Sequence, residues 1–156
     1  MVDELHGRRR LLDGGLRAGL VECIKNAVER HDWTLDHWVV LENHYHLLVQ
    51  SRLGADLPDV IRAIHGSSAV GIRARTGCAL PVWYNYWDYC PRHEGDWYRH
   101  LNYLLWNPIK HDYVRDLRDW PDSSFHALLA TEGRERLDAQ FRAYPDFREL
   151  DVDDDY

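Results

Sequence analysis

The sequence predicts an α+β domain in which an antiparallel sheet carries helices on one face. Two observations support this prediction. Segments with apolar residues at helical spacing alternate with short segments rich in β-branched and aromatic residues, and two of the strand-like segments are joined by a tight reversal. Elements in this order form a layer of helices packed on a sheet. The length of 156 residues fits one such domain.

The first half of the chain begins with a predicted helix and a hairpin. Residues 15–31 place apolar side chains at helical spacing, namely Leu16, Leu20, Ile24, Ala27 and Val28. Residues 33–42 and 44–50 are rich in β-branched and aromatic residues and predict two strands. Asn43, between them, marks the reversal, so the two strands are expected to pair.

The middle of the chain predicts a second helix and a third strand. A loop is expected over residues 52–55, after which Asp56 can cap a helix with Pro58 in its first turn. Gly77 is the expected stop of this helix. A third strand is then predicted over residues 80–89.

The last part predicts two more helices. Asp96 caps the first of them, and Pro108 must end or kink it because proline offers no amide hydrogen. Residues 120–125 are expected to form a turn and residues 126–142 a final helix. The acidic residues 151–156 are expected to be a solvated tail.

The predicted order is most of a ferredoxin-like domain with its first strand apparently missing. Residues 1–12 are predicted to be poor strand candidates, because GRRR (7–10) is charged and the apolar pair Leu11 and Leu12 comes only at the end of the segment. We assign residues 1–128 to this domain, and residues 129–156 to a C-terminal helix and acidic tail.

Charge and cysteine content restrict the class of protein. The net charge of −7 argues against a general nucleic-acid binder, but residues 113–156 hold 12 acidic residues and 6 arginines, which leaves the rest of the chain at −1. No apolar stretch is long enough to cross a bilayer. Three cysteines without close spacing indicate reduced thiols, so a cytoplasmic location and no membrane association are expected.

Two histidines share one face of the second predicted strand. Side chains alternate along a strand, so His44 and His46 point to one face, while Tyr45, Leu47 and Val49 line the packed face. Two imidazoles at this spacing can bind one metal ion. The alternative is a pair of partly exposed histidines without a ligand, and the spacing alone favours that alternative.

A tyrosine lies on the polar stripe of the third predicted helix. His100, Tyr103 and Asn107 recur at helical spacing beside the apolar face. The phenol of Tyr103 can act as a nucleophile, or its ring can pack at the edge of the core with the hydroxyl in water. Because Pro108 disfavours helical geometry at the residue before it, counting turns does not fix the position of Asn107.

Separate segments together resemble REP-associated tyrosine transposases, a branch of the single-tyrosine HUH transposases. The resemblance covers roughly residues 7–126, and its ordered motifs are more specific than any one of them alone. The matching segments are NHYHLLV (43–49), AIHGSSAVGIRARTG (63–77), VWYNYWDYCPR (82–92), YLLWNPIKHDYV (103–114) and DWPDSSF (119–125).

The resemblance implies a metal-dependent cleavage and rejoining of single-stranded DNA. His44 and His46 fall on the family's metal ligands, Asn107 falls on its third, oxygen ligand, and Tyr103 falls on its nucleophile. Two imidazoles and an amide oxygen suit Mg²⁺ or Mn²⁺. The implied intermediate is a 5′-phosphotyrosine, the implied substrate is single-stranded DNA with a hairpin, and a homodimer that shares the tyrosine is one implied arrangement.

Several residues are candidates for DNA binding, each with surface charge or packing as the alternative role. They are Arg62, Arg73, Arg75, Trp83, Tyr86, Arg92 and Lys110. Two departures from the family pattern stand out. Leu41 and Glu42 replace a Met-Pro pair, and His65 replaces a lysine. The alternative functions are a non-catalytic protein that binds DNA hairpins, and a metal-dependent phosphodiesterase that uses water.

Overall fold

The structure is a computed structural model that describes residues 2–5, 12–51, 54–78 and 81–150. Its elements follow one another as β1 (Val2–Leu5), α1 (Gly14–Arg30), β2 (Thr34–Val40), β3 (His44–Gln50), α2 (Leu57–Thr76), β4 (Trp83–Trp87), α3 (Glu94–Lys110), the 3₁₀ turn η1 (Leu117–Asp119), α4 (Phe125–Glu132), α5 (Arg134–Ala143) and the 3₁₀ turn η2 (Pro145–Glu149). None of the helices in these ranges is long and apolar enough to cross a membrane.

The four strands form one antiparallel sheet in the order β2-β3-β1-β4, which confirms the predicted ferredoxin-like fold class. The prediction that the first strand is missing is wrong. β1 lies in the middle of the sheet, with Val2 opposite His46 on β3 and opposite Trp87 on β4. Its composition hid it, because a short central strand obtains its backbone hydrogen bonds from two neighbours whatever its side chains are.

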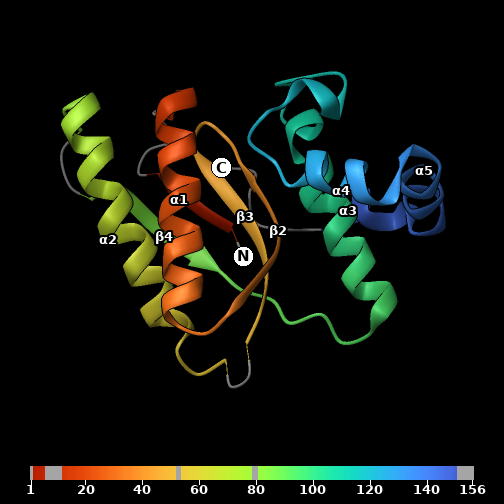
Figure 1. Ribbon diagram of the computed structural model, residues 1–156, viewed down its shortest axis with the longest axis horizontal. Coiled ribbons are helices and arrows are strands. Elements are labelled where there is room, and N and C mark those ends of the chain that lie inside the picture. Colours follow the sequence, from red (N-terminus) through yellow and green to blue (C-terminus); the bar gives the residue numbers. More distant parts are fainter. Residues whose placement is uncertain (1, 6–11, 52–53, 79–80, 151–156) are drawn as a thin grey trace.

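Helices α1 and α2 lie side by side on one face of the sheet, as predicted (Figure 1). The capping residues of these helices explain their bounds. The carboxylate of Asp13 accepts a hydrogen bond from the Leu16 amide at 2.9 Å, and Gly77 ends α2 with a φ of 66°. Their apolar sides pack on Tyr45 and Leu47 of β3 to form the first core. Burial of this surface is the main stabilising term of the layer.

Helix α3 packs against the other face of the sheet, so the sheet carries helices on both sides (Figure 1). Leu101, Leu104 and Leu105 of α3 meet Val39 and Leu41 in a second core. The two cores are possible because consecutive residues of a strand point to opposite faces. One face of β2 and β3 therefore packs against α1 and α2, and the other face packs against α3.

Three predicted helix limits need correction. Helix α3 begins at Glu94 with His93 as its N-cap, so the predicted cap Asp96 lies inside the first turn. Pro108 does not end α3, which continues through it to Lys110, although proline cannot donate the helical hydrogen bond to the carbonyl of Leu104. The predicted helix over residues 126–142 is divided into α4 and α5 at Gly133, whose φ of 79° is not helical. The loop residues 52 and 53, residue 80 of the third predicted strand and the tail 151–156 lie outside the described residues.

The boundary predicted after residue 128 falls inside α4. Leu137 of α5 joins the second core, and Phe147 of η2 packs against Tyr103. The described C-terminal residues therefore pack directly on α3.

Candidate active site

The two histidines of β3 face α3 and are buried. His44 is 1% exposed and His46 is 4% exposed, so the alternative of a partly exposed pair is wrong. Their ring centroids lie 5.1 Å apart with the planes at 84°. Tyr45, between them, packs in the first core on the opposite face, as the alternation along the strand predicts.

Helix α3 brings the tyrosine and the asparagine to this pair. The ring centroid of Tyr103 lies 5.7 Å from that of His46, and the Oδ1 atom of Asn107 lies 3.2 Å from Nε2 of His44. Since α3 is helical through Pro108, Asn107 stays four residues after Tyr103 on the same face of the helix. Residues that are about 60 positions apart in the chain thus meet within one chain.

Asn43 fixes the ring of His44. Its Oδ1 atom lies 2.8 Å from Nδ1 of His44, while the amide oxygen of Asn107 lies on the other side of the ring. A neutral imidazole carries one N–H and can donate to only one of these two oxygens. With the proton on Nδ1 toward Asn43, the lone pair of Nε2 points toward Asn107. The ring is then oriented as a metal-binding imidazole is.

Two residues at the end of α3 complete the surroundings of the site. The Lys110 ammonium donates a hydrogen bond to the phenolic oxygen of Tyr103 at 2.7 Å. From the sequence, Lys110 was predicted to contact a DNA phosphate. Its contact with Tyr103 could have been expected from their helical spacing (i, i+7). The ring of His111 lies 5.0 Å from that of His44. His111 was not predicted as a site residue.

The donor atoms suit a hard divalent cation. Two ligands at right angles around an ion with bonds of about 2.1 Å lie about 3.0 Å apart, close to the 3.2 Å between Nε2 of His44 and Oδ1 of Asn107. Within the described ranges there is no group of three His, Cys, Asp or Glu side chains that could hold a metal. The candidate set here, His44, His46 and Asn107, contains an amide oxygen instead.

The predicted DNA-binding residues are spread over the molecule. Arg62, Arg73 and Arg75 lie on α2, across the sheet from Tyr103. Arg62 forms an ion pair with Asp59, and Arg75 forms one with Asp13. Whether these arginines also contact DNA stays a prediction.

Trp83 packs in the core instead of presenting its ring to solvent. It is 8% exposed, and its indole nitrogen donates to Ser68 at 2.9 Å. Its ring stacks on His65, the residue that departs from the family pattern, at 4.9 Å. Tyr86 is half-buried and packs against the same first core. For both aromatic residues, the structure corresponds to the packing alternative.

Residues 119–125, which carry the DWPDSSF match, hold the edge of the sheet. The backbone of Asp122 and Ser124 bonds to β2, and Ser123 forms a bridge with Val39. The carboxylate of Asp122 accepts a hydrogen bond from Arg17 of α1 at 2.5 Å. This segment therefore ties α1 to the strand that packs under α3, which is a structural role.

A groove of about 760 Å³ leads to the tyrosine. Its walls include His46 of β3, Tyr103 of α3 and the segment of residues 87–93 that joins β4 to α3. Arg92, predicted to bind DNA, is exposed and lines this groove. The groove thus connects one predicted DNA-binding residue with the candidate nucleophile.

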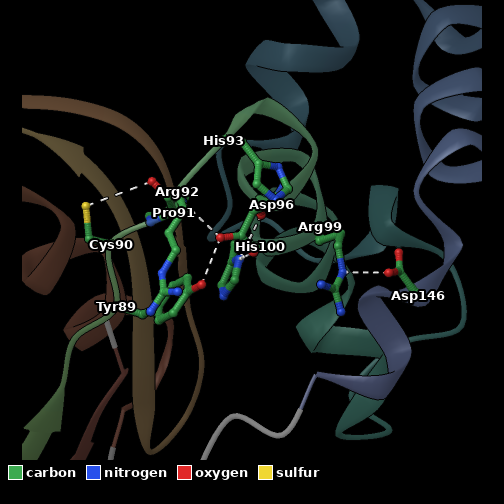
Figure 2. Close-up of polar contacts among 9 residues, drawn as sticks. All are labelled: Tyr89, Cys90, Pro91, Arg92, His93, Asp96, Arg99, His100 and Asp146. Carbon is green, nitrogen blue, oxygen red and sulfur yellow. Dashed lines mark hydrogen bonds and ion pairs between the residues drawn. The ribbon is translucent and has the colours of Figure 1, made fainter.

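Asp96 organises one wall of the groove (Figure 2). Its carboxylate accepts hydrogen bonds from the Tyr89 hydroxyl at 2.8 Å and from the Arg92 amide at 3.0 Å. Desolvation raises the pKa of Asp96, but these two hydrogen bonds together with the charges of His100 and His93 lower it more, so its pKa lies below the ordinary value. The hydrogen bond to the carboxylate raises the pKa of Tyr89, whose hydroxyl therefore stays protonated at neutral pH.

Two curated relatives resemble this chain in sequence. The REP-associated tyrosine transposase of Escherichia coli (strain K12) is 30% identical over 100 residues, which are 62% of this chain and 56% of that protein. A Haemophilus influenzae protein also described by the words REP-associated tyrosine transposase is 44% identical over 47 residues, 30% of this chain and 27% of that one. The chain thus spans about half or less of the curated relatives it matches.

A solved structure described as a REP-associated tyrosine transposase bound to a REP hairpin has a similar fold. It superimposes with a TM-score of 0.70 and 26% identity, over 83% of this chain and 77% of that one. Residues 4–87, more than half of the chain, match the family described as Transposase IS200 like. The chain belongs to the IS200-like transposase family.

Proposed function

We propose that this protein cleaves and rejoins single-stranded DNA through a covalent bond between Tyr103 and a 5′-phosphate. One observation carries the proposal: the Tyr103 ring lies 5.7 Å from the ring of His46 within one chain, at the end of a groove. The nucleophile and the candidate metal ligands are therefore available without a partner subunit. A nucleophile near a cation site is the arrangement that phosphoryl transfer needs.

His44, His46 and Asn107 would hold the metal, with Mg²⁺ or Mn²⁺ as the ions that suit their atoms. The two nearby oxygens around His44 support this assignment, because a cation between Nε2 of His44 and Oδ1 of Asn107 would satisfy both lone pairs. When bound, such an ion draws charge out of the scissile phosphate and makes phosphorus easier to attack. Asn43 contributes by holding the His44 ring in the metal-binding orientation.

The chemical step that we propose for Tyr103 balances without an external energy source. Its phenolic oxygen loses a proton and forms a bond to phosphorus, while the bond from phosphorus to the 3′-oxygen breaks and that oxygen takes up a proton. The energy of the ester is retained, so the free 3′-hydroxyl can later attack the phosphotyrosine and reverse the step. Lys110 supports the step, because its ammonium lies 2.7 Å from the oxygen that becomes negative.

Single-stranded DNA that carries a hairpin is the substrate that we propose. The support is the likeness to a relative whose solved structure is described as bound to a REP hairpin. The charge distribution is compatible with this substrate, because the excess of acidic residues belongs to residues 113–156. Arg92 in the groove is the charged residue best placed to contact the DNA backbone near Tyr103.

The test is covalent capture of DNA. The protein is incubated with a labelled hairpin that carries single-stranded arms, with Mg²⁺, with Mn²⁺ or with EDTA, and the products are separated under denaturing conditions. We expect a protein–DNA adduct that requires the metal and disappears in Tyr103→Phe. An adduct that survives this substitution refutes the nucleophile, and cleavage without any adduct indicates hydrolysis by water. Tyr84→Phe is the matched control, since Tyr84 is 70% exposed.

A further inference from the structure

A row of parallel aromatic rings lines the groove beside Tyr103. The rings of Trp87 and Tyr89 are nearly parallel, at 4°, with centroids 5.8 Å apart. Tyr89 in turn stacks on His100, at 14° and 4.6 Å. Trp87 and Tyr89 are each 38% exposed, although large aromatic side chains of this kind usually pack away from water. All three residues line the groove that contains Tyr103.

Two of the three rings, Tyr89 and His100, are held in place by hydrogen bonds to Asp96 (Figure 2). The Tyr89 hydroxyl donates to the Asp96 carboxylate at 2.8 Å, and Nδ1 of His100 lies 2.8 Å from the Asp96 carbonyl oxygen. The same carboxylate also accepts a hydrogen bond from the backbone amide of Arg92. Rings that are already oriented lose little conformational entropy when a ligand stacks on them, so this wall is preorganised for binding.

The row lies one helical turn from the nucleophile. His100 precedes Tyr103 by three residues on α3, and residues at this spacing have Cβ atoms about 5–6 Å apart on the same face of a helix. A base that extends the row from its other end, at Trp87, would lie farther along the same wall of the groove, within the single-stranded arm near the phosphate that Tyr103 attacks.

An unpaired nucleobase is the occupant that fits these features. Aromatic platforms bind single-stranded DNA because each base offers a flat π-surface, whereas a paired base within a duplex is already stacked. Trp87 ends the row, so a base can extend the stack from its ring. The exposed side chain of Arg92 adds a positive charge to the same wall.

We propose that Trp87, Tyr89 and His100 form a stacking subsite for one unpaired base of the single-stranded arm near the scissile phosphate. This inference rests on the proposed function for its substrate and concerns the single-stranded arm of the DNA. It assigns the binding of that arm to the wall formed by the 87–93 segment and α3.

The test combines a protein variant with a scan of abasic sites. Binding is measured by fluorescence anisotropy with Tyr103→Phe protein, which removes the proposed nucleophile, and with hairpins in which one arm nucleotide at a time lacks its base. We expect one abasic position near the cleavage site to weaken binding roughly 5- to 100-fold, which corresponds to the loss of one stacked base. When Trp87→Ala is combined with Tyr103→Phe, the affinity for the intact DNA should fall by a similar factor. Removing the base at that one position should then weaken binding no further.

Control variants separate stacking from general damage. Trp87→Phe keeps an aromatic ring, so the abasic DNA should still bind more weakly than the intact DNA at that one position. Tyr84→Ala removes an exposed aromatic residue of β4 that does not line the groove, so it should change neither the affinity for intact DNA nor the effect of the abasic site. Equal abasic penalties with and without Trp87 overturn the proposal, as does a uniform loss at every position. Adduct formation is measured separately, with protein that keeps Tyr103. If no adduct forms, the proposed function is refuted, while the binding data still show whether the stacking subsite exists.

Discussion

Replacing Lys110 by methionine tests the chemistry of the site most directly. Its ammonium lies 2.7 Å from the oxygen of Tyr103. Two unit charges at this distance interact by about 6 kcal/mol at an effective dielectric constant of about 20, which is an upper bound because both groups also lose hydration. A hydrogen bond to a charged group contributes a net of about 1.5–3 kcal/mol. We therefore expect Lys110→Met to slow adduct formation about 10- to 150-fold.

The assay is the single-turnover rate of adduct formation at saturating DNA, with the affinity for DNA measured in parallel. A contact with the transition-state charge lowers the rate and leaves the affinity nearly unchanged, whereas a DNA phosphate contact would weaken binding. Lys25→Met is the matched control, because Lys25 is the only other lysine and is exposed on α1. A Lys110→Met protein that keeps the original rate would refute the role that we assign to the ammonium.

Three further predictions concern the metal ligands and the stability of the fold. Asn43→Ala removes the side chain that orients the neighbouring His44 ring, so the Mn²⁺ concentration needed for half-maximal adduct formation should rise about 10- to 100-fold. The exposed variant Asn85→Ala should leave this concentration unchanged. The same Mn²⁺ requirement in both variants would contradict the orienting role. Asp122→Ala leaves the largely buried Arg17 without its ion pair and should lower the free energy of unfolding by about 2–4 kcal/mol in urea titrations; a loss near zero would contradict the tie between α1 and β2. Burial lowers the pKa of His37 from 6.5, so the unfolded chain binds the proton first as the pH falls, and stability declines below about pH 6.5. His37→Phe should reduce that decline, and an unchanged pH profile would show that His37 does not cause it.

The segments next to the site were predictable because their patterns are local. Alternation along the strand at residues 44–50 placed His44 and His46 on one face and Tyr45 on the other, and the structure confirms this arrangement. Helical spacing placed His100 and Tyr103 on one stripe of α3, and the observed helix extends this stripe to Asn107 because it continues through Pro108. These patterns depend only on the geometry of one element, which a short stretch of chain determines.

The first strand and the end of α3 could not be predicted in the same way. β1 has four residues and gains its place from hydrogen bonds to β3 and β4, which are distant in the chain. Pro108 indicated that the helix ends, yet α3 continues for two residues and brings Lys110 to Tyr103. In both cases, contacts with other elements outweigh the local propensity.

The sequence by itself determined the fold class, the faces of the individual elements and the family motifs, because periodicity and motif spacing are properties of neighbouring residues. Only the tertiary structure decided that the phenol of Tyr103 lies beside His46 in the same chain and that Trp87, Tyr89 and His100 form one row. These contacts join residues of different elements or distant turns. Their distances follow from how α3 packs across the sheet, which no local pattern specifies.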